Sequence, residues 1–237
     1  MCADISPPVK KNAFTLIELL LVLGVMAVLS ALIAATAWTK FAEVRAIHCF
    51  GNLRQWGIAL HNYAQDNNGH IPRRGQGVQP VFRINRPEDW FNALPPYLEM
   101  DSYYDLFQAG KHPQPGDRSV FVCPEASFPD NNIHFISYGM NMYVSRWDRV
   151  TRMRLSELPM LSSLAFMADA PGGYASTVPS AQGYSVQARH QNHANVLFFD
   201  GHIKSFSAKY LGCGEREKNH PDIRWNPKID GDTWTAN

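Results

Sequence analysis

Four side chains near the C-terminal end of the sequence could bind a metal ion. The stretch RHQNHANVLFFDGH holds His190, His193, Asp200 and His202, and Zn²⁺ accepts imidazole and carboxylate ligands. A hairpin is the competing interpretation, because two runs of β-forming residues flank Asp200-Gly201 and predict a type I′ turn there. In an extended strand His190 would lie about 30 Å from Asp200 unless a turn intervenes. The spacing therefore favours the hairpin, with histidines that hydrogen-bond locally.

A single carboxylate stands in an otherwise apolar stretch near the N-terminus. After Glu18 no formal charge occurs from Leu19 to Thr39, and about 20 helical residues span the hydrocarbon core of a bilayer. An ionised carboxylate at that depth costs at least roughly 3 kcal/mol unless it has a partner. If the chain is cut between Ala13 and Phe14, every copy gains an α-amino group four residues before Glu18. We predict that this amine pairs with Glu18 of a neighbouring copy and so sets the register of assembly.

The apolar stretch has two other interpretations. As a secretory signal peptide it would have a positively charged n-region at Lys10 and Lys11 and an A-x-A cleavage site at residues 35–37. Cleavage near Ala37 would release a Sec-exported soluble protein, periplasmic or extracellular, and a hydrolase would fit that description. Glu18 and the length of the apolar run argue against this, because signal peptides usually have about 7 to 15 apolar residues. A buried helix of a soluble protein is disfavoured because both faces are apolar.

The N-terminal residues resemble a known class of filament protein. KKNAFTLIELLLVLGVMAVLSALIAA has a basic leader, a small residue, Phe-Thr-Leu-Ile-Glu and an apolar helix, and in this it is similar to type IV pilins and type II secretion pseudopilins. The resemblance implies that a prepilin peptidase cuts after Ala13, where the family usually has Gly, and N-methylates Phe14. It also implies the assembly role of Glu18. The implied partners are the peptidase, other pilin or pseudopilin subunits of a homo- or hetero-filament, and inner-membrane lipid.

The rest of the chain carries two further resemblances. His190, nine residues and then Asp200-Gly201 resemble the tail of a pilin-like family named for this spacing, and other features similar to that family are LRQWGIALHNYAQDNNGHIP, FVCP and SYGMN. The resemblance assigns no chemical role to that motif. Major pseudopilins bind Ca²⁺ in a C-terminal loop, and Asp230 and Asp232 in KIDGDTW could supply oxygen ligands. The alternative is a solvated turn, and no other cofactor is expected.

The remaining pattern predicts an α+β protein in which a long N-terminal transmembrane helix packs on a C-terminal antiparallel sheet. No proline occurs between Pro8 and Pro72, which permits one helix from about Thr15 to Asp66. Asn67-Asn68-Gly69 are residue types suited to the left-handed cap that ends a helix. Strands are expected in SVFVCP, ISYGMNMYV, SSLAFMAD and the hairpin. The expected domains are a leader at 1–13, a transmembrane and assembly helix at 14–39, its amphipathic continuation at 40–68 and a pilin-like head at 69–237.

Composition and short motifs narrow the function. Lys and Arg number 22 against 21 Asp and Glu, a net charge of +1, so no nucleic-acid partner is expected. The sequence has no G-x-S-x-G, P-loop or HExxH motif, and we predict that the protein is not an enzyme. If Cys2 is lost with the leader, one disulfide at most can form. Cys123 with Cys213 is the expected pair, because Cys49 would lie on the N-terminal helix.

These observations predict a structural subunit of a type IV pilus-like or type II secretion pseudopilus-like filament. Lys10 and Lys11 favour a cytoplasmic N-terminus. The resemblance implies a single-pass protein of the bacterial inner membrane with a periplasmic head, which later joins the filament.

Overall fold

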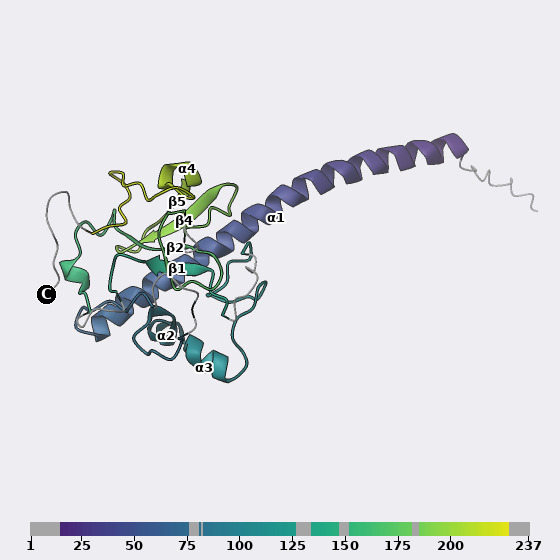
Figure 1. Cartoon of the computed structure of the whole chain (residues 1–237). Helices are drawn as coiled ribbons and strands as arrows, with labels where there is room; N and C mark the ends of the chain where they lie inside the picture. Colours follow the sequence, from purple (N-terminus) through teal and green to yellow (C-terminus); the bar gives the residue numbers. More distant parts are fainter. Residues whose placement is uncertain are drawn as a thin grey trace, which may run out of the picture. The chain divides into compact units, whose positions relative to one another are not determined.

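The computed structural model describes residues 15–75, 81, 83–126, 134–146, 152–181 and 185–227, and only the backbone at 35–43. The chain divides into two compact units, residues 1–43 and residues 44–237. We call the second unit the head. Helix α1 (Leu16–Asp66) contributes to both units (Figure 1).

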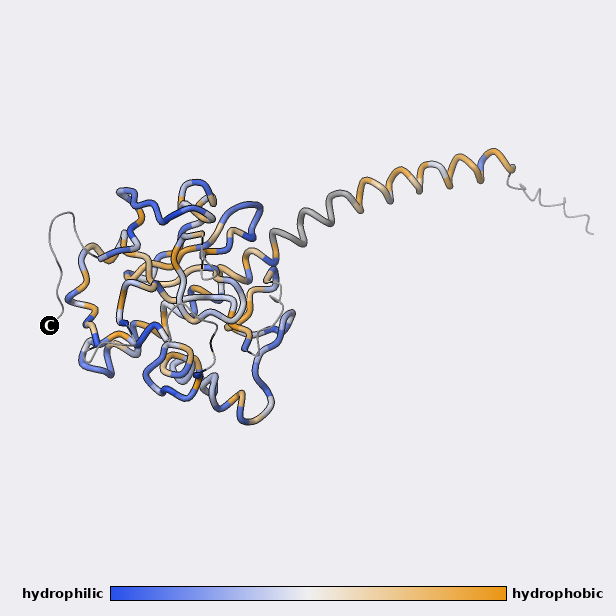
Figure 2. The backbone as a smooth tube through the Cα atoms, in the orientation of Figure 1, coloured by the Kyte–Doolittle hydropathy of each residue, from blue (hydrophilic) through white to orange (hydrophobic). Residues whose placement is uncertain are grey.

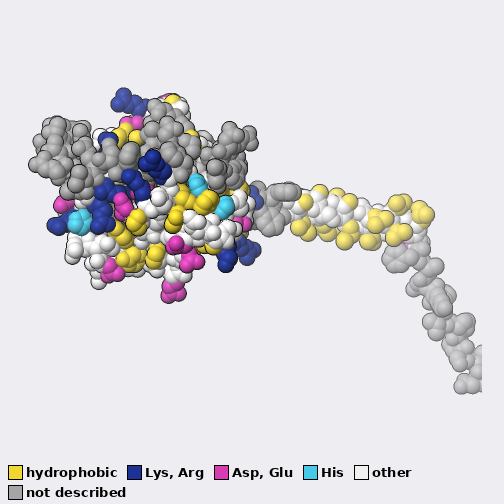
Figure 3. Space-filling model, turned by 60° about the horizontal axis from the view of Figure 1, so that its bottom comes forward, with side chains coloured by type: hydrophobic (Ala, Val, Ile, Leu, Met, Phe, Trp, Pro, Cys, Tyr) yellow, Lys and Arg dark blue, Asp and Glu magenta, His cyan; other side chains and the backbone are white. Residues whose placement is uncertain are grey.

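The N-terminal part of α1 is apolar on all sides. Within the described residues, Leu16–Ala34 is long and apolar enough to cross a membrane, and none of this segment is buried inside the chain itself. Its hydrophobic residues form the orange part of α1 in Figure 2, and in Figure 3 yellow side chains cover the visible face of the segment. This length and composition are consistent with a membrane anchor.

The C-terminal part of α1 is amphipathic and belongs to the head. The side chains that recur at three- and four-residue steps are buried, namely Cys49, Leu53, Trp56, Leu60 and Tyr63. The helix ends as the sequence predicts, because Asn68 and Gly69 take positive φ values of 54° and 80°, and the Gly69 N–H donates to the Ala64 carbonyl at 2.8 Å.

The described part of the head contains a five-stranded sheet. Its strands are β1 (Tyr138–Asn141), β2 (Ala165–Asp169), β3 (Ser176–Thr177), β4 (His193–Phe198) and β5 (Ile203–Ser207), in the order β3-β1-β2-β4-β5. The expected antiparallel sheet is wrong in one pairing, since β3 runs parallel to β1. Asp169 at the end of β2 pairs with Tyr138 at the start of β1. The chain therefore leaves β2 near the start of β1, and β3 can pair with the other edge of β1 in the same direction. The layout is α+β and pilin-like, with a mixed sheet.

Short helices and irregular segments complete the head. The short helices are α2 (Trp90–Ala93), η1 (Pro95–Leu98), α3 (Tyr103–Gln108), η2 (Leu155–Glu157) and α4 (Ala208–Leu211). The strand expected in SVFVCP is wrong, because two of its carbonyls accept hydrogen bonds from side chains of α1 rather than from a neighbouring strand. Asn52 Nδ2 donates to Val122 at 2.9 Å, and Trp56 Nε1 donates to Val120 at 3.1 Å.

Both faces of the sheet are covered. On one face α1 packs through Trp56, whose ring lies 5.1 Å from that of Trp90, within a core that includes Leu197. On the other face Phe198 and Trp225 belong to a second apolar cluster. Successive residues of β4 thus face opposite sides, as a pleated strand requires.

Candidate functional site

The carboxylate of Glu18 closes the first turn of α1. Glu18 Oε2 accepts hydrogen bonds from the Thr15 backbone N–H and from the Thr15 hydroxyl, both at 2.8 Å, while Thr15 Oγ1 accepts from the Glu18 N–H at 3.3 Å. This reciprocal arrangement is a capping box, and the signal for it is the T-x-x-E pattern of residues 15–18. Ala13 and Phe14 lie outside the described residues. Within a single chain, Glu18 therefore has a local partner as well as the intermolecular role predicted for it.

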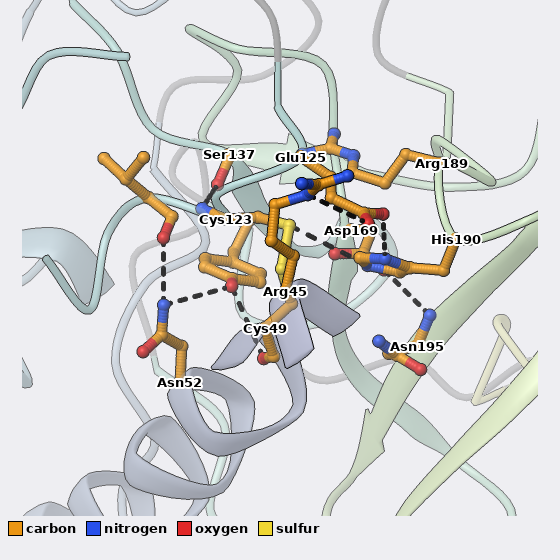
Figure 4. Close-up of a disulfide and its surroundings, with 12 residues drawn as sticks. Arg45, Cys49, Asn52, Cys123, Glu125, Ser137, Asp169, Arg189, His190 and Asn195 are labelled. Atoms are coloured by element: carbon orange, nitrogen blue, oxygen red, sulfur yellow. Dashed lines mark hydrogen bonds and ion pairs between the residues drawn. A yellow bond between two sulfur atoms is a disulfide. The ribbon is translucent and has the colours of Figure 1, made fainter. Parts of the chain in front are cut away.

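A disulfide bonds α1 to the head. It joins Cys49 and Cys123, with their Cα atoms 5.0 Å apart and both side chains fully buried (Figure 4). The expected pairing of Cys123 with Cys213 is therefore wrong. Cys213 follows α4 and packs against the apolar cluster on the far side of the sheet, so the sheet separates it from Cys123. Burial raises the pKa of the Cys213 thiol to about 11.

His190, the first residue of the motif, lies between two carboxylates beside this disulfide. Its Nδ1 is 2.6 Å from Glu125 Oε2, and its Nε2 is 3.2 Å from Asp169 Oδ2 and 3.8 Å from Cys123 Sγ. Burial by itself would lower the pKa of His190. The hydrogen bonds and charges of Asp169, and then of Glu125, raise this pKa by more than burial lowers it, so the net pKa lies above its usual 6.5. In its imidazolium form the ring can donate to both acids, from Nδ1 to Glu125 and from Nε2 to Asp169. We call Cys49, Cys123, Glu125, Asp169 and His190 the His190 cluster.

Four segments that are distant in the sequence supply this cluster. Asp169 ends β2 and accepts a hydrogen bond from the Asn195 N–H of β4 at 2.8 Å. Glu125 follows Cys123 by two residues and lies 3.5 Å from Arg45 Nε on α1. The cluster therefore ties α1, the irregular segment after residue 119 and strands β2 and β4 together, as Figure 4 shows.

A tight turn places His190 beside the other residues of the His190 cluster. Gln191 and Asn192 have positive φ values of 51° and 64°, and His190 and His193 exchange backbone hydrogen bonds of 3.0 and 2.9 Å. Two central residues with positive φ are the mark of a type I′ turn, so this turn lies just before β4. The turn places His190 beside His193 at the start of β4, so His190 and Asp200 still lie at opposite ends of that strand.

The other end of the motif forms a different turn from the expected one. Gly201 has a φ of 91°, but Asp200 is not among the described non-glycine residues with positive φ, and the Gly201 N–H donates to the Phe198 carbonyl at 3.0 Å. This is the three-residue loop in which a left-handed glycine follows a type I turn, not a type I′ turn. Asp200 Oδ1 accepts hydrogen bonds from the backbone N–H and the ring Nδ1 of His202, at 3.1 and 2.6 Å.

The Asp-Gly turn also packs on α1. A Cβ added at Gly57 would lie 3.7 Å from the Gly201 Cα and 3.1 Å from Leu197 Cδ1, so the absence of side chains at both glycines permits a close approach. The motif residues thus flank β4. At one end His190 contacts Cys123, which is bonded to Cys49 of α1, and at the other end Gly201 packs against Gly57 of α1. The geometry gives the motif a positioning role, which is to seat the sheet on α1.

The structure does not bring together the four residues of the zinc hypothesis. His190 faces Glu125 and Asp169, while Asp200 pairs with His202 beyond the far end of β4. His193 is exposed, and its Nδ1 lies 3.0 Å from the Gln191 carbonyl. Within the described part of the chain, the atoms close enough to share a metal are those of Cys49, Cys123 and His190, and their two sulfurs form the disulfide. Asp230 and Asp232, the candidate Ca²⁺ ligands, lie outside the described residues.

We predict that His190→Gln lowers the free energy of unfolding of the head by roughly 2 to 3 kcal/mol at pH 6, because the buried Asp169 loses its cationic partner. Because the folded-state pKa of His190 is raised, its contribution is complete below the unfolded-state pKa of about 6.5 and is lost as the pH rises through the higher folded-state value. The difference between wild type and variant should therefore shrink with increasing pH, which urea titrations at several pH values measure. His193→Gln, at the exposed end of the same turn, is the control. A difference that is constant or grows with pH contradicts the imidazolium assignment.

Within the described residues, the apolar N-terminal helix and the α+β head have a pilin-like layout. Comparison with family models agrees with a pilin-like class of protein. Residues 9–34 match the model described as "Prokaryotic N-terminal methylation motif", and residues 43–153 match "Protein of unknown function (DUF1559)". No curated protein and no solved structure matches the chain. The chain thus carries the prepilin-type methylation segment of a type IV pilin-like or pseudopilin-like protein.

Proposed function

We propose that this protein is a structural subunit of a type IV pilus-like or type II secretion pseudopilus-like filament. The observation that carries the proposal is the methylation motif at residues 9–34, which overlaps the apolar segment Leu16–Ala34. Methylation-motif proteins are substrates of prepilin peptidases and assemble with other pilin subunits, and their family role is structural rather than enzymatic. The subunit resides in the bacterial inner membrane as a single-pass protein with a periplasmic head before it joins the filament.

Assembly uses the apolar surface of the N-terminal part of α1. Leu16, Ile17 and Ile33 are each more than half exposed in the single chain, as are most large apolar side chains between them. Lipid covers these side chains before assembly, and the helices of other subunits replace lipid afterwards. Because lipid is itself apolar, packing and polar pairing between helices drive association. The pairing of Glu18 with the N-terminal amine of a neighbour then selects one axial register.

The mature N-terminus tests this function. We expect the protein from its native membrane to begin at Phe14 with one added methyl group on the α-amine, by N-terminal sequencing and intact mass. A matched sample from cells without the prepilin peptidase should retain residues 1–13. A soluble chain that begins near Trp38 would instead establish the Sec-exported alternative, and would rule out both the peptidase and the filament.

A further inference from the structure

Among the described residues, the head has two hollows that share a lining residue. The larger has a volume of about 780 Å³ and the smaller of about 620 Å³, and Pro87 lines both. Arg73 and Arg152 line the larger hollow, and Arg83 and Arg86 line the smaller. We call the pair of hollows the Pro87 groove. Its residues lie apart from the His190 cluster and from the N-terminal segment, so the proposed function makes no use of it.

Arg152 is a fixed cation in the wall of the larger hollow. One of its Nη atoms donates to the hydroxyl of Tyr63, which holds the guanidinium in place. Among the described residues, no carboxylate lies within ion-pair distance of Arg152. Arg73 differs, because its Nε lies 3.6 Å from Glu88 Oε1 and its Nη1 donates to the Arg146 carbonyl at 2.8 Å. A guanidinium with unused donors binds a carboxylate through two parallel hydrogen bonds.

The wall next to Arg152 offers an aromatic ring and hydrogen-bond acceptors. The ring of Tyr97 packs edge to face on Tyr63 with centroids 5.8 Å apart, and its hydroxyl accepts a hydrogen bond from Asn67 Nδ2 at 3.3 Å. Asp66, the last residue of α1, lines the same hollow. A sugar ring presents an apolar face that can pack on tyrosine and hydroxyl groups that can donate to a carboxylate or an amide oxygen.

The mixture of charges distinguishes between the polymers that an arginine groove could bind. A phosphate backbone carries one negative charge per nucleotide and would meet the carboxylates of Asp66 and Glu88 in the same wall as the arginines. A saccharide that carries carboxylates also has free hydroxyl groups on each sugar, which a phosphate backbone lacks, and these hydroxyls can donate hydrogen bonds to Asp66 and Glu88. The groove therefore suits an acidic saccharide better than a nucleic acid.

We propose that the Pro87 groove binds an acidic saccharide, with a sugar carboxylate on Arg152, the ring on Tyr97 and hydroxyl groups donating to Asp66. The second hollow, with Arg83 and Tyr104, takes the adjoining sugar of an oligomer. The proposal is independent of the filament, since it concerns a surface of one head.

Calorimetric titration of the full-length chain in detergent with a galacturonic acid trimer tests the proposal. We expect binding to wild type, and affinity at least about tenfold lower for Arg152→Gln, because the variant loses the charge-assisted hydrogen bonds to the sugar carboxylate. Tyr97→Ala should also weaken binding. Arg118→Gln changes an exposed arginine that lines neither hollow, and should bind as wild type does.

Neutral and phosphate-bearing probes separate the alternatives. A galactose trimer, which lacks the carboxylates, should bind at least about tenfold more weakly than the acidic trimer. Equal binding of the neutral trimer, tighter binding of a single-stranded oligodeoxynucleotide, no binding of the acidic trimer, or an unchanged affinity in Arg152→Gln would each overturn the proposal. Urea unfolding of each variant confirms that the head remains folded. None of these results depends on whether the protein assembles.

Discussion

Replacing Cys49 and Cys123 together by alanine lowers the free energy of unfolding of the head by about 4 kcal/mol. The disulfide closes a loop with a sequence separation of 74 residues, and in the chain-entropy description a cross-link of that length removes on the order of 4 kcal/mol of conformational entropy from the unfolded chain. Both sulfurs are also fully buried, so the variant loses apolar contacts. Urea unfolding of the full chain, followed by tryptophan fluorescence, measures the change.

The third described cysteine provides the matched control for this experiment. Cys213 is not in a disulfide and is only partly buried, so Cys213→Ala should change the free energy of unfolding by less than about 1 kcal/mol. A reducing agent should destabilise the wild type and the Cys213 variant but leave the double variant unchanged. If the double variant resists urea as well as the wild type, the covalent link does not stabilise the head.

Glu18 is the position at which substitution has the largest expected effect on assembly. Both Glu18→Ala and Glu18→Gln should be processed normally and yet enter filaments at least about tenfold less than wild type, because a charge-assisted pair contributes about 1.5 to 3 kcal/mol to each addition. Sheared filaments compared with membrane-retained subunits, by quantitative immunoblot, give the ratio. N-terminal mass shows whether processing is intact.

The two variants distinguish the intermolecular pair from the capping box. Glutamine at residue 18 keeps an oxygen that can accept from Thr15 but lacks the charge that an amine requires. Thr15→Ala removes the hydroxyl of the box and leaves the carboxylate of Glu18 in place. The register hypothesis therefore expects poor assembly for Glu18→Gln and near-normal assembly for Thr15→Ala. The reverse order would assign the effect to helix capping alone.

The sequence was most informative where local rules determine the structure. Absence of proline up to Pro72 and the residues 67–69 predicted the course and the end of α1, and the Asp200-Gly201 signal predicted the β4–β5 hairpin. The turn type was wrong because a glycine alone can supply the single positive φ that a three-residue loop needs. The capping box was not predicted, although the T-x-x-E pattern of residues 15–18 is its sequence signature.

The His190 cluster could not be predicted from local patterns. Glu125 precedes His190 by 65 residues, and no rule of spacing indicates that the two meet. The predicted pairing of Cys123 with Cys213 was wrong for a related reason, since the sequence does not show that these two cysteines pack on opposite sides of the sheet. Strand β3 has two residues, too few for any periodicity to be recognised.

The position of the Cys49–Cys123 bond has a mechanical consequence for a filament whose subunits are held by their apolar helices. Tension that enters the head along α1 reaches Cys49 before it reaches the rest of the buried helix face, and the bond passes it directly to Cys123. Residues 50–122, which include much of the aromatic core, lie within the covalent loop and are shielded from stretching. An intact disulfide therefore limits how far one subunit can extend under load.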